Sequence, residues 1–388
     1  MLEGPLRIAL VALGFPPAVG GTERYNVEYA RRLHARGHAL RVFAFGADGP
    51  GAAGEREADA RLPFPVQREP GRERSGQLGP GALAAWLADA RPEVVLLSRA
   101  SRRLARAASV AARAAPLVVS VHELAGRHTR RGVIGRWRVR RRYGLDLARH
   151  IVVNSRDTGR RVAALRAAAP IEVVHPGVDT AAFATDTAAR RAARERLGLA
   201  DSRVVLTVSR LASNKGHARV IEALPSLRAR FPDLVYVVVG EGAERPALEK
   251  LAAARGVAAA VRFEGLVDDV RAWYAASDVF AMVSGRAGAQ KAGEGFGIAY
   301  AEAGAAGVPV VASASGGGSE VVVDGETGRL VEPGDARALE VALAELLADP
   351  EAARRLGEAA RRHCARFDWE RGADVLEGVL ARAAGRAA

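Results

Sequence analysis

Two carboxylates frame a glycine-rich turn in the second half of the chain. They are Glu294 and Glu302, the ends of the segment EGFGIAYAE. The glycines favour a loop and the next residues a helix that begins around Gly297, so both carboxylates are expected near one face of that helix. The N–H groups and the dipole at a helix start stabilise a diphosphate, and carboxylates accept hydrogen bonds from sugar or ribose hydroxyls. The alternative is a turn in which Glu294 only stabilises the helix.

Two cations follow an apolar run in the segment SRLASNKG, which precedes a predicted helix. They are Arg210 and Lys215. On a loop from strand to helix, the arginine fork and the lysine point charge can clamp a diphosphate. The loop lacks the Gly-x-x-x-x-Gly-Lys-Ser/Thr pattern of a Walker P-loop. Solvated surface cations are the alternative interpretation.

Paired glycines and a histidine are the candidates in the first half. Gly20 and Gly21 lie between the opening apolar run and a predicted helix, where a missing side chain lets a phosphate approach the backbone. Thr22 is predicted to cap that helix. His122 and Glu123 stand at the carboxyl end of an apolar run, the place where open α/β sheets bind ligands. A plain tight turn and a structural histidine are the alternatives.

Short apolar runs rich in β-branched residues recur along the chain, with helix-patterned segments between them. Continuous runs of this kind are typical of parallel strands buried on both faces. The predicted strands are Ile8 to Leu13, Val94 to Leu97, Leu117 to Val121, Ile151 to Val153, Val204 to Val208, Leu234 to Val239, Val279 to Val283 and Val308 to Ala312. The pattern predicts two doubly wound α/β domains that meet near Pro176 to Thr187. The stretch Gly46 to Gly81 is predicted to be surface loop.

Positive charge is concentrated in the first half. Residues 1–180 carry 30 Arg against 16 Asp and Glu, a net charge of +14, whereas the remainder carries −1. This asymmetry indicates an anionic partner. Nine arginines lie between Arg127 and Arg149 among apolar residues, which favours a basic helix that contacts a membrane or a lipid phosphate, or else a solvated helix packed by its apolar side. Nucleic acid is not expected, because no recognition motif accompanies the charge.

Composition excludes several other classes. The single cysteine, Cys364, excludes an intrachain disulfide framework and indicates a reducing compartment. The apolar runs are too short to span a bilayer, and the first residues do not match an export signal. Without an Asp-x-Asp motif or a His/Cys cluster of ligand spacing, neither a metal nor another cofactor is expected. We therefore expect a cytoplasmic protein, with peripheral contact to the inner face of the membrane through the basic segment.

Taken in order, these segments resemble the retaining glycosyltransferases of family 4, which have the GT-B fold. In that fold two Rossmann-like domains face each other across a cleft. The resemblance rests on FPPAVGGTERYNVEYARRLHARGHALRVF, SVHEL, IVVNS, VVHPGVD, VSRLASNKGH, VVGEGAER, VRFEGLVDD, YAASDVFAMVS, EGFGIAYAEA, GVPVVAS, GGGSEVVVDGETGRLVEPGD and FDWERGA. It implies an acceptor-binding domain over residues 1–178, a donor-binding domain over 179–366, and a helix over 367–388 that returns to the first domain.

The resemblance also implies a role for each matched residue. Arg210 and Lys215 would clamp the diphosphate of a nucleotide-sugar donor, and Glu302 would contact its ribose. Glu294 would hold the transferred sugar and the distal phosphate, and Val267 would lie near the edge of the base. The backbone N–H groups of Phe296, Gly297 and Ile298 would also hold the transferred sugar and the distal phosphate.

Three residues of the first domain complete the implied site. His122 would reach the sugar from the opposite domain, and Gly20 and Gly21 would line the cleft near the phosphates. The implied reaction is a metal-independent hexose transfer that retains the anomeric configuration. The charge that develops on the leaving diphosphate would be stabilised by Arg210, Lys215 and the helix start.

The donor and acceptor follow from a finer likeness. FPPAVGG, HPGVD and the long connection Ser284 to Glu294 are most like the bacterial phosphatidylinositol mannosyltransferase branch, although His175 replaces the usual Asn of the family's turn. This favours GDP-mannose as donor and an anionic or lipid-linked acceptor, in the biosynthesis of a glycolipid, polysaccharide or glycoside. The alternatives are a UDP-hexose or UDP-N-acetylhexosamine donor, a GT-B nucleotide-sugar epimerase, and a non-catalytic nucleotide-sugar or membrane-binding protein.

Overall fold

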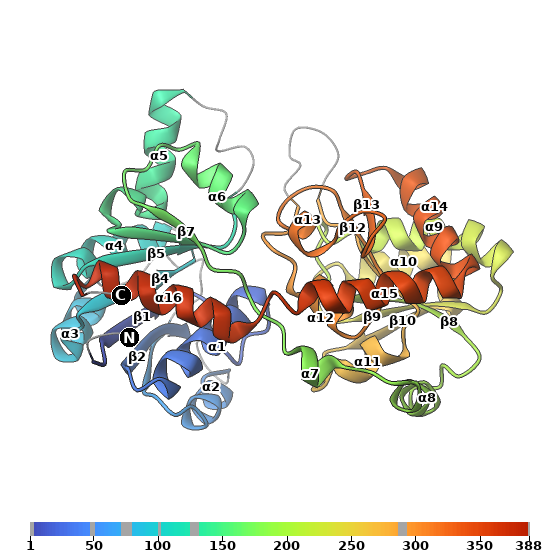
Figure 1. Cartoon of the computed structure of the whole chain (residues 1–388), viewed down its shortest axis with the longest axis horizontal. Coiled ribbons are helices and arrows are strands. Elements are labelled where there is room, and N and C mark those ends of the chain that lie inside the picture. The colour runs from blue at the N-terminus through green and yellow to red at the C-terminus, as the bar shows by residue number, and fades with distance from the viewer. Residues whose placement is uncertain are drawn as a thin grey trace. The chain divides into compact units, whose positions relative to one another are not determined.

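The chain forms two parallel β-sheets, each covered by helices, in a computed structural model (Figure 1). The structure describes residues 4–46, 51–70, 80–99, 102–124, 132–285 and 293–386. The chain divides into two compact units. Unit 1 comprises Met1–Pro176 and Trp369–Ala388, and unit 2 comprises Gly177–Asp368. The predicted α/β class with two Rossmann-like sheets is confirmed.

Unit 1 contains a seven-stranded sheet with the strand order β3-β2-β1-β4-β5-β6-β7. Its strands are β1 (Arg7–Ala12), β2 (Ala39–Gly46), β3 (Val66–Pro70), β4 (Val94–Ser98), β5 (Leu117–Val121), β6 (His150–Val153) and β7 (Ile171–Val173). Its helices are α1 (Gly21–Ala35), α2 (Gly51–Ala60), α3 (Pro80–Ala90), α4 (Arg102–Ala114), α5 (Val133–Tyr143), α6 (Arg156–Ala163) and α16 (Trp369–Ala383), with a 3₁₀ turn η2 (Leu145–Leu147).

Unit 2 contains a six-stranded sheet with the strand order β10-β9-β8-β11-β12-β13. Its strands are β8 (Arg203–Val208), β9 (Leu234–Val239), β10 (Val261–Gly265), β11 (Val279–Met282), β12 (Val310–Ser313) and β13 (Gly328–Val331). Its helices are α7 (Thr180–Phe183), α8 (Thr187–Arg196), α9 (His217–Arg230), α10 (Arg245–Ala254), α11 (Arg271–Ala276), α12 (Ile298–Ala305), α13 (Gly318–Val321), α14 (Ala336–Ala348) and α15 (Pro350–Cys364), with a 3₁₀ turn η3 (Ala258–Ala260).

The central strands are apolar along their length because both of their faces are buried. In β1, Ile8 and Leu10 belong to one hydrophobic cluster, while Ala9 and Val11 belong to the cluster on the other face. All four are at most 2% exposed. This is the arrangement expected of a parallel sheet covered by helices on both sides.

The terminal helix α16 packs on α1 in unit 1. Trp369 is buried against Tyr29 at a ring distance of 5.3 Å. A Cβ on Gly372 would come within 1.9 Å of the Tyr29 hydroxyl, so this close packing requires glycine. Arg36, the C-cap residue of α1, forms ion pairs with Asp374 at 2.8 Å and with two glutamates of α16. The segment after residue 367 thus forms a helix that packs within unit 1.

The prediction of surface loop from Gly46 to Gly81 was wrong. The structure has helix α2 and strand β3 there, and residues 47–50 and 71–79 lie outside the described ones. β3 pairs in parallel with β2, with Val66 opposite Val42. Arg68 of β3 donates to Asp59 of α2 at 2.6 Å. β3 lies at the edge of the sheet and carries polar residues, so it does not form the continuous apolar run that predicts a buried strand.

Two predictions about helix ends were also wrong. α1 begins at Gly21, its N-cap is Gly20, and no side chain caps it, so Thr22 lies inside the helix instead of capping it. The basic helix covers only Val133–Tyr143, because Gly144 at φ +68° ends it; the first part of the predicted segment, residues 127–131, lies outside the described ones. Within the described part of the chain, no helix combines the length and apolar character needed to cross a bilayer.

Candidate active site

Three predicted donor residues of unit 2 follow adjacent central strands. From β8 the order runs outward through β9 and β10, and from β11 it runs the other way through β12 and β13. The carboxyl ends of β8 and β11 therefore flank the topological switch point, where open α/β sheets bind ligands. Arg210 and Lys215 follow β8, and Glu294 follows β11. The sheet order itself thus brings residues from distant parts of the sequence to one edge of the sheet.

The Lys215 ammonium is paired with the Glu294 carboxylate. Nζ donates to the two carboxylate oxygens at 2.7 and 3.0 Å, and the side chains are 16% and 14% exposed. Burial would raise the pKa of Glu294, but the charge and hydrogen bond of Lys215 outweigh it, with a contribution from Arg210, and the pKa is lowered. Glu294 is therefore ionised at neutral pH and can accept hydrogen bonds from hydroxyl groups.

Glycines hold the backbone of Glu294 against the loop that follows β12. The Gly317 N–H donates to the Glu294 carbonyl at 2.8 Å. Gly316 has φ +84°, and a Cβ there would come within 2.3 Å of the same carbonyl oxygen. A Cβ on Gly293 would come within 1.8 Å of the Ser315 carbonyl oxygen. The position of Glu294 thus depends on close contact between two backbone segments, which leaves no room for a side chain at Gly293 or Gly316.

Helix α12 begins inside the glycine-rich turn, as predicted. Its N-cap, Gly297, has φ +95°, and a Cβ there would lie 2.2 Å from the Tyr300 ring. The Phe296 side chain is 2% exposed and packs edge-on against Phe367 at 5.1 Å. Phe296 and Gly297 therefore offer only their backbone to a ligand bound here. With Ile298 they lie at a helix start, where N–H groups have no helical partners.

The second carboxylate, Glu302, is buried within α12. It is 5% exposed, and its Oε2 accepts a hydrogen bond from the Tyr274 hydroxyl at 2.8 Å. The tyrosine itself is fully buried, so this contact fixes the direction of the carboxylate.

The predicted base-binding segment ends just beyond β10. Val267 is half-buried and packs against the hydrophobic cluster on one face of the sheet. The adjacent Leu266 is 63% exposed. Of these two neighbours, Leu266 is therefore the more exposed apolar side chain, although Val267 is the residue named from the sequence.

Gly20, the first of the paired glycines of unit 1, lies under a carboxylate, as does Gly14. Gly20 precedes α1, and Cβ atoms added to Gly14 and Gly20 would meet the Glu23 carboxylate at 2.2 and 2.3 Å. Glu23 is 14% exposed and lies 3.7 Å from Arg99 in an ion pair. The space next to Gly14 and Gly20 is thus occupied by an anionic side chain of the protein itself.

His122 lies at the carboxyl end of β5 as predicted, and it is 8% exposed. Its Nε2 is 3.0 Å from the Ser98 hydroxyl and 3.2 Å from the Ser120 hydroxyl. The Asn26 amide donates to the Gly14 carbonyl, and Ser98 donates to the Asn26 oxygen at 2.6 Å. The Ser98 oxygen is therefore left to accept from His122, which places the ring proton on Nε2.

The structure thus groups the predicted residues into two sets. Arg210, Lys215, Glu294 and the start of α12 belong to unit 2, whereas Gly20, Gly21 and His122 belong to unit 1. Among the residues that the structure describes, no group of three or more His, Cys, Asp and Glu side chains is arranged to hold a metal ion.

Comparison with known proteins decides the family. The family model described as Glycosyltransferase Family 4 matches residues 19–182. The model described as Glycosyl transferases group 1 matches residues 189–363. A GDP-mannose-dependent alpha-(1-6)-phosphatidylinositol monomannoside mannosyltransferase of Mycolicibacterium smegmatis is 36% identical over 98% of this chain and 100% of its own. The chain belongs to glycosyltransferase family 4. It is a hexosyltransferase, and the protein of the same description from Mycobacterium tuberculosis H37Rv is 35% identical over 97% of both chains.

Solved structures share the fold of this glycosyltransferase. HepE of Anabaena in complex with UDP has a TM-score of 0.79 and 24% identity, over 97% of this chain and 99% of that one. Sucrose-phosphate synthase of Thermosynechococcus elongatus has a TM-score of 0.76 and 24% identity, over 97% and 98% of the two chains. These likenesses show that the fold is GT-B.

Sequence reasoning gave no role to a buried polar cluster beneath the cation loop of the glycosyltransferase. His217, the first residue of α9, is 2% exposed and lies 3.0 Å from the Ser209 hydroxyl and 3.1 Å from the Tyr236 hydroxyl. Tyr236 in turn lies 2.9 Å from the Thr207 hydroxyl. The motif VSRLASNKGH shows that a histidine, His217, follows the loop. Its partner Tyr236 lies on the next strand, β9, so the local sequence does not show the contact. The cluster supports the backbone from which Arg210 and Lys215 project.

Acid is expected to destabilise the glycosyltransferase through two of its buried histidines, His122 and His217. Burial and the nearby Lys215 lower the pKa of His217 to about 4, and burial and Arg99 lower the pKa of His122 to about 3. Because an unfolded histidine binds a proton near pH 6.5, the unfolded state holds more protons between that pH and the folded pKa values. The free energy of unfolding should fall there by up to about 1.4 kcal/mol per pH unit for each histidine.

Urea unfolding at pH 7, 6 and 5 measures this slope. His217→Gln keeps a donor and an acceptor at the site but cannot titrate, so its free energy of unfolding should depend less on pH than that of the wild type. An unchanged slope in His217→Gln would show that His217 is not held neutral by the fold.

Proposed function

We propose that this glycosyltransferase moves mannose from GDP-mannose to an anionic, lipid-linked acceptor, with retention of the anomeric configuration and without a metal ion. The observation that carries the proposal is the Lys215–Glu294 pair at the switch point of unit 2, beside the start of α12. The donor and the acceptor class are supported by the mycobacterial relatives, whose descriptions name GDP-mannose and phosphatidylinositol monomannoside. A peripheral place at the inner face of the membrane is part of the proposal.

In the proposed reaction, the bond between the anomeric carbon and the diphosphate oxygen breaks. An acceptor hydroxyl oxygen forms the new bond on the same face of the sugar, and its proton passes to the leaving diphosphate. Negative charge grows on that diphosphate, so donors fixed near it stabilise the transition state more than the ground state. Arg210, Lys215 and the N–H groups at the start of α12 supply this stabilisation in place of a metal.

The remaining residues position the donor in this proposal. Glu294 accepts hydrogen bonds from the sugar, Glu302 contacts the ribose, and Val267, with the exposed Leu266 beside it, borders the base. His122, kept neutral by burial, contacts the sugar as a hydrogen-bonding group and not as a cation.

GDP-mannose is expected to stabilise the protein more than UDP-glucose, UDP-N-acetylglucosamine or ADP-glucose. A ligand at 100 times its dissociation constant adds about 2.7 kcal/mol to the free energy of unfolding, which a thermal-shift assay resolves. Radiolabelled GDP-mannose should then label a phosphatidylinositol mannoside acceptor, and NMR of the product should show the α-configuration of the donor.

The alternatives give different results in the same assays. A larger shift with a UDP-sugar would replace GDP-mannose as donor. Conversion of UDP-N-acetylglucosamine without any acceptor would identify an epimerase, and binding without transfer to any acceptor would identify a non-catalytic protein.

A further inference from the structure

A chain of buried hydrogen bonds in unit 1 begins at the Gly14 carbonyl and ends on His122. The Asn26 side chain of α1 donates from Nδ2 to that carbonyl at 2.8 Å, and its Oδ1 accepts from the Ser98 hydroxyl at 2.6 Å. The Ser98 oxygen, at the end of β4, lies 3.0 Å from Nε2 of His122. Asn26, Ser98 and His122 are 3%, 1% and 8% exposed, so water does not compete for these bonds.

The carbonyl at one end fixes the direction of the whole chain. A carbonyl only accepts, so the amide nitrogen of Asn26 faces Gly14 and the amide oxygen faces Ser98. Ser98 has one hydroxyl proton, and that oxygen takes it. The Ser98 oxygen would therefore meet a bare lone pair of His122 unless the ring carries its proton on Nε2. The second hydroxyl near Nε2, that of Ser120 at 3.2 Å, accepts from the same proton.

The His122 ring is held in place as well as in one tautomer. The Tyr25 ring packs edge-on against it, with ring centroids 4.5 Å apart and planes at 79°. The Asn154 amide donates to the His122 carbonyl at 2.9 Å and so holds the backbone. Burial and the charge of Arg99 lower the pKa of His122 to about 3, so the ring is neutral near pH 7. Nδ1 therefore keeps its lone pair, and among the described residues no group donates a hydrogen bond to it.

We propose that Asn26 and Ser98 are positioning residues for the sugar transfer, because they hold His122 with Nδ1 as the acceptor for one hydroxyl group of the transferred sugar. Neither residue touches the sugar, and both act through the histidine. An acceptor of fixed direction requires a hydroxyl proton, so a deoxy sugar loses the bond and leaves the nitrogen unpaired. The opposite tautomer would present an N–H group to the same hydroxyl.

The inference rests on the proposed function, in which His122 contacts the sugar. The tautomer is measured in the free protein, without donor and without turnover. If the wild type transfers no mannose, the proposed function fails, whereas the spectrum of the free protein still decides whether Asn26 and Ser98 set the tautomer.

Long-range NMR of protein labelled with ¹⁵N-histidine measures the tautomer, and His122→Gln assigns the signals. Wild type should show a protonated Nε2 and an unprotonated Nδ1. In Asn26→Ala the Ser98 proton is free to turn toward Nε2, and in Ser98→Ala the acceptor of the Nε2 proton is missing, so both spectra should show the opposite tautomer in part. Ser98→Thr keeps the hydroxyl and should keep the wild-type spectrum. A wild-type proton on Nδ1, or an unchanged tautomer in Asn26→Ala and Ser98→Ala, would overturn the proposal.

Kinetics test whether the tautomer matters for the transfer. Asn26→Ala and Ser98→Ala should each lower kcat/KM for GDP-mannose about tenfold, the usual contribution of one neutral hydrogen bond. A panel of monodeoxy analogues of GDP-mannose then gives a double-mutant cycle between protein and substrate. The analogue without the hydroxyl that Nδ1 accepts should lose about tenfold with wild type and nothing further with Asn26→Ala. Equal losses in both proteins for every analogue would show that Asn26 supports the fold only.

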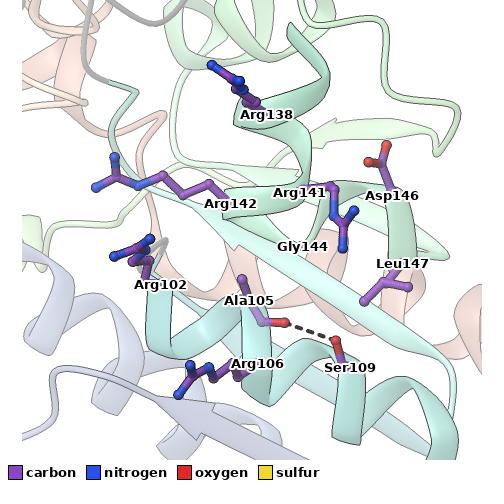
Figure 2. Close-up of a pocket in the computed structure, with 10 residues that line it drawn as sticks. All are labelled: Arg102, Ala105, Arg106, Ser109, Arg138, Arg141, Arg142, Gly144, Asp146 and Leu147. Atoms are coloured by element: carbon purple, nitrogen blue, oxygen red, sulfur yellow. Dashed lines mark hydrogen bonds between the residues drawn. The ribbon is translucent and has the colours of Figure 1, made fainter. Parts of the chain in front are cut away.

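Two control variants remove a hydroxyl of unit 1 that forms its hydrogen bond elsewhere. Thr158→Val removes the hydroxyl of a residue in α6 that is 2% exposed. Ser109→Ala removes an exposed hydroxyl that donates to the Ala105 carbonyl one turn earlier in α4 (Figure 2). Both variants should keep the wild-type tautomer and a kcat/KM within about twofold of wild type. A changed tautomer in Thr158→Val would mean that the loss of any buried hydroxyl disturbs the His122 ring, and the specific role of the chain would be wrong.

Discussion

Lys215→Ala is expected to lower kcat for mannosyl transfer by about 10²–10³-fold, the usual cost of removing one donor that stabilises a developing anion. Lys215 is only 16% exposed, so water does not readily replace its charge. The substitution also leaves the 14% exposed Glu294 carboxylate without the cation that lowers its pKa. Steady-state and single-turnover rates with GDP-mannose measure the loss, and thermal melting measures the accompanying destabilisation.

Paired variants separate catalysis from stability in this experiment. Lys215→Ala/Glu294→Gln removes both charges of the pair, so it should melt closer to wild type than Lys215→Ala does, while its kcat stays low. Lys250→Ala removes an exposed lysine of α10 in the same unit and should leave kcat within twofold of wild type. If the double variant regains both stability and turnover, Lys215 supports the fold only and has no part in the transfer.

The strands that could be predicted from the sequence are those inside the two sheets. β1, β4, β5, β6, β8, β9, β11 and β12 were all predicted, and each has neighbours on both sides. The missed strands include the four sheet edges, β3, β7, β10 and β13. Edge strands are partly solvated and carry residues such as Arg262 and Glu264 in β10, so they do not read as continuous apolar runs.

One missed strand is not at an edge. β2 lies between β3 and β1, and most of its residues are buried. Its apolar run is interrupted by Arg41, which reaches out to Asp89 at 2.7 Å. A single arginine whose charged end reaches solvent thus interrupts the apolar run of this central strand.

The candidate site divides in the same way. The places of Arg210 and Lys215 could be predicted because their motif directly follows β8, and that of Glu294 because its motif leads into α12. Their pairing could not, since Lys215 and Glu294 are 79 positions apart and meet only because β8 and β11 are neighbours in the sheet. A contact that depends on the order of the strands in a sheet cannot be predicted from the local sequence.

Gly316→Ala is expected to lower kcat/KM by about 100-fold, although Gly316 contributes no side chain to the site. Any L-residue there meets two costs. The φ of +84° is left-handed, which costs about 1–2 kcal/mol. The added Cβ also lies 2.3 Å from the Glu294 carbonyl oxygen, so the backbone that carries the carboxylate must move. A displacement of about 1 Å in a catalytic group is sufficient for a loss of this size.

Gly325→Ala isolates the second cost. Gly325 has φ +73° in the same unit, but the nearest atom to a Cβ there is the end of the Arg329 side chain at 3.7 Å. Both variants should therefore lose similar stability from the left-handed backbone, and only Gly316→Ala should lose turnover and the thermal shift with GDP-mannose. Equal kinetic losses would mean that backbone strain alone disturbs the site, and wild-type kinetics in Gly316→Ala would mean that the position of Glu294 does not depend on this close approach. The comparison thus asks whether the missing side chain at residue 316 is what holds the carboxylate in place.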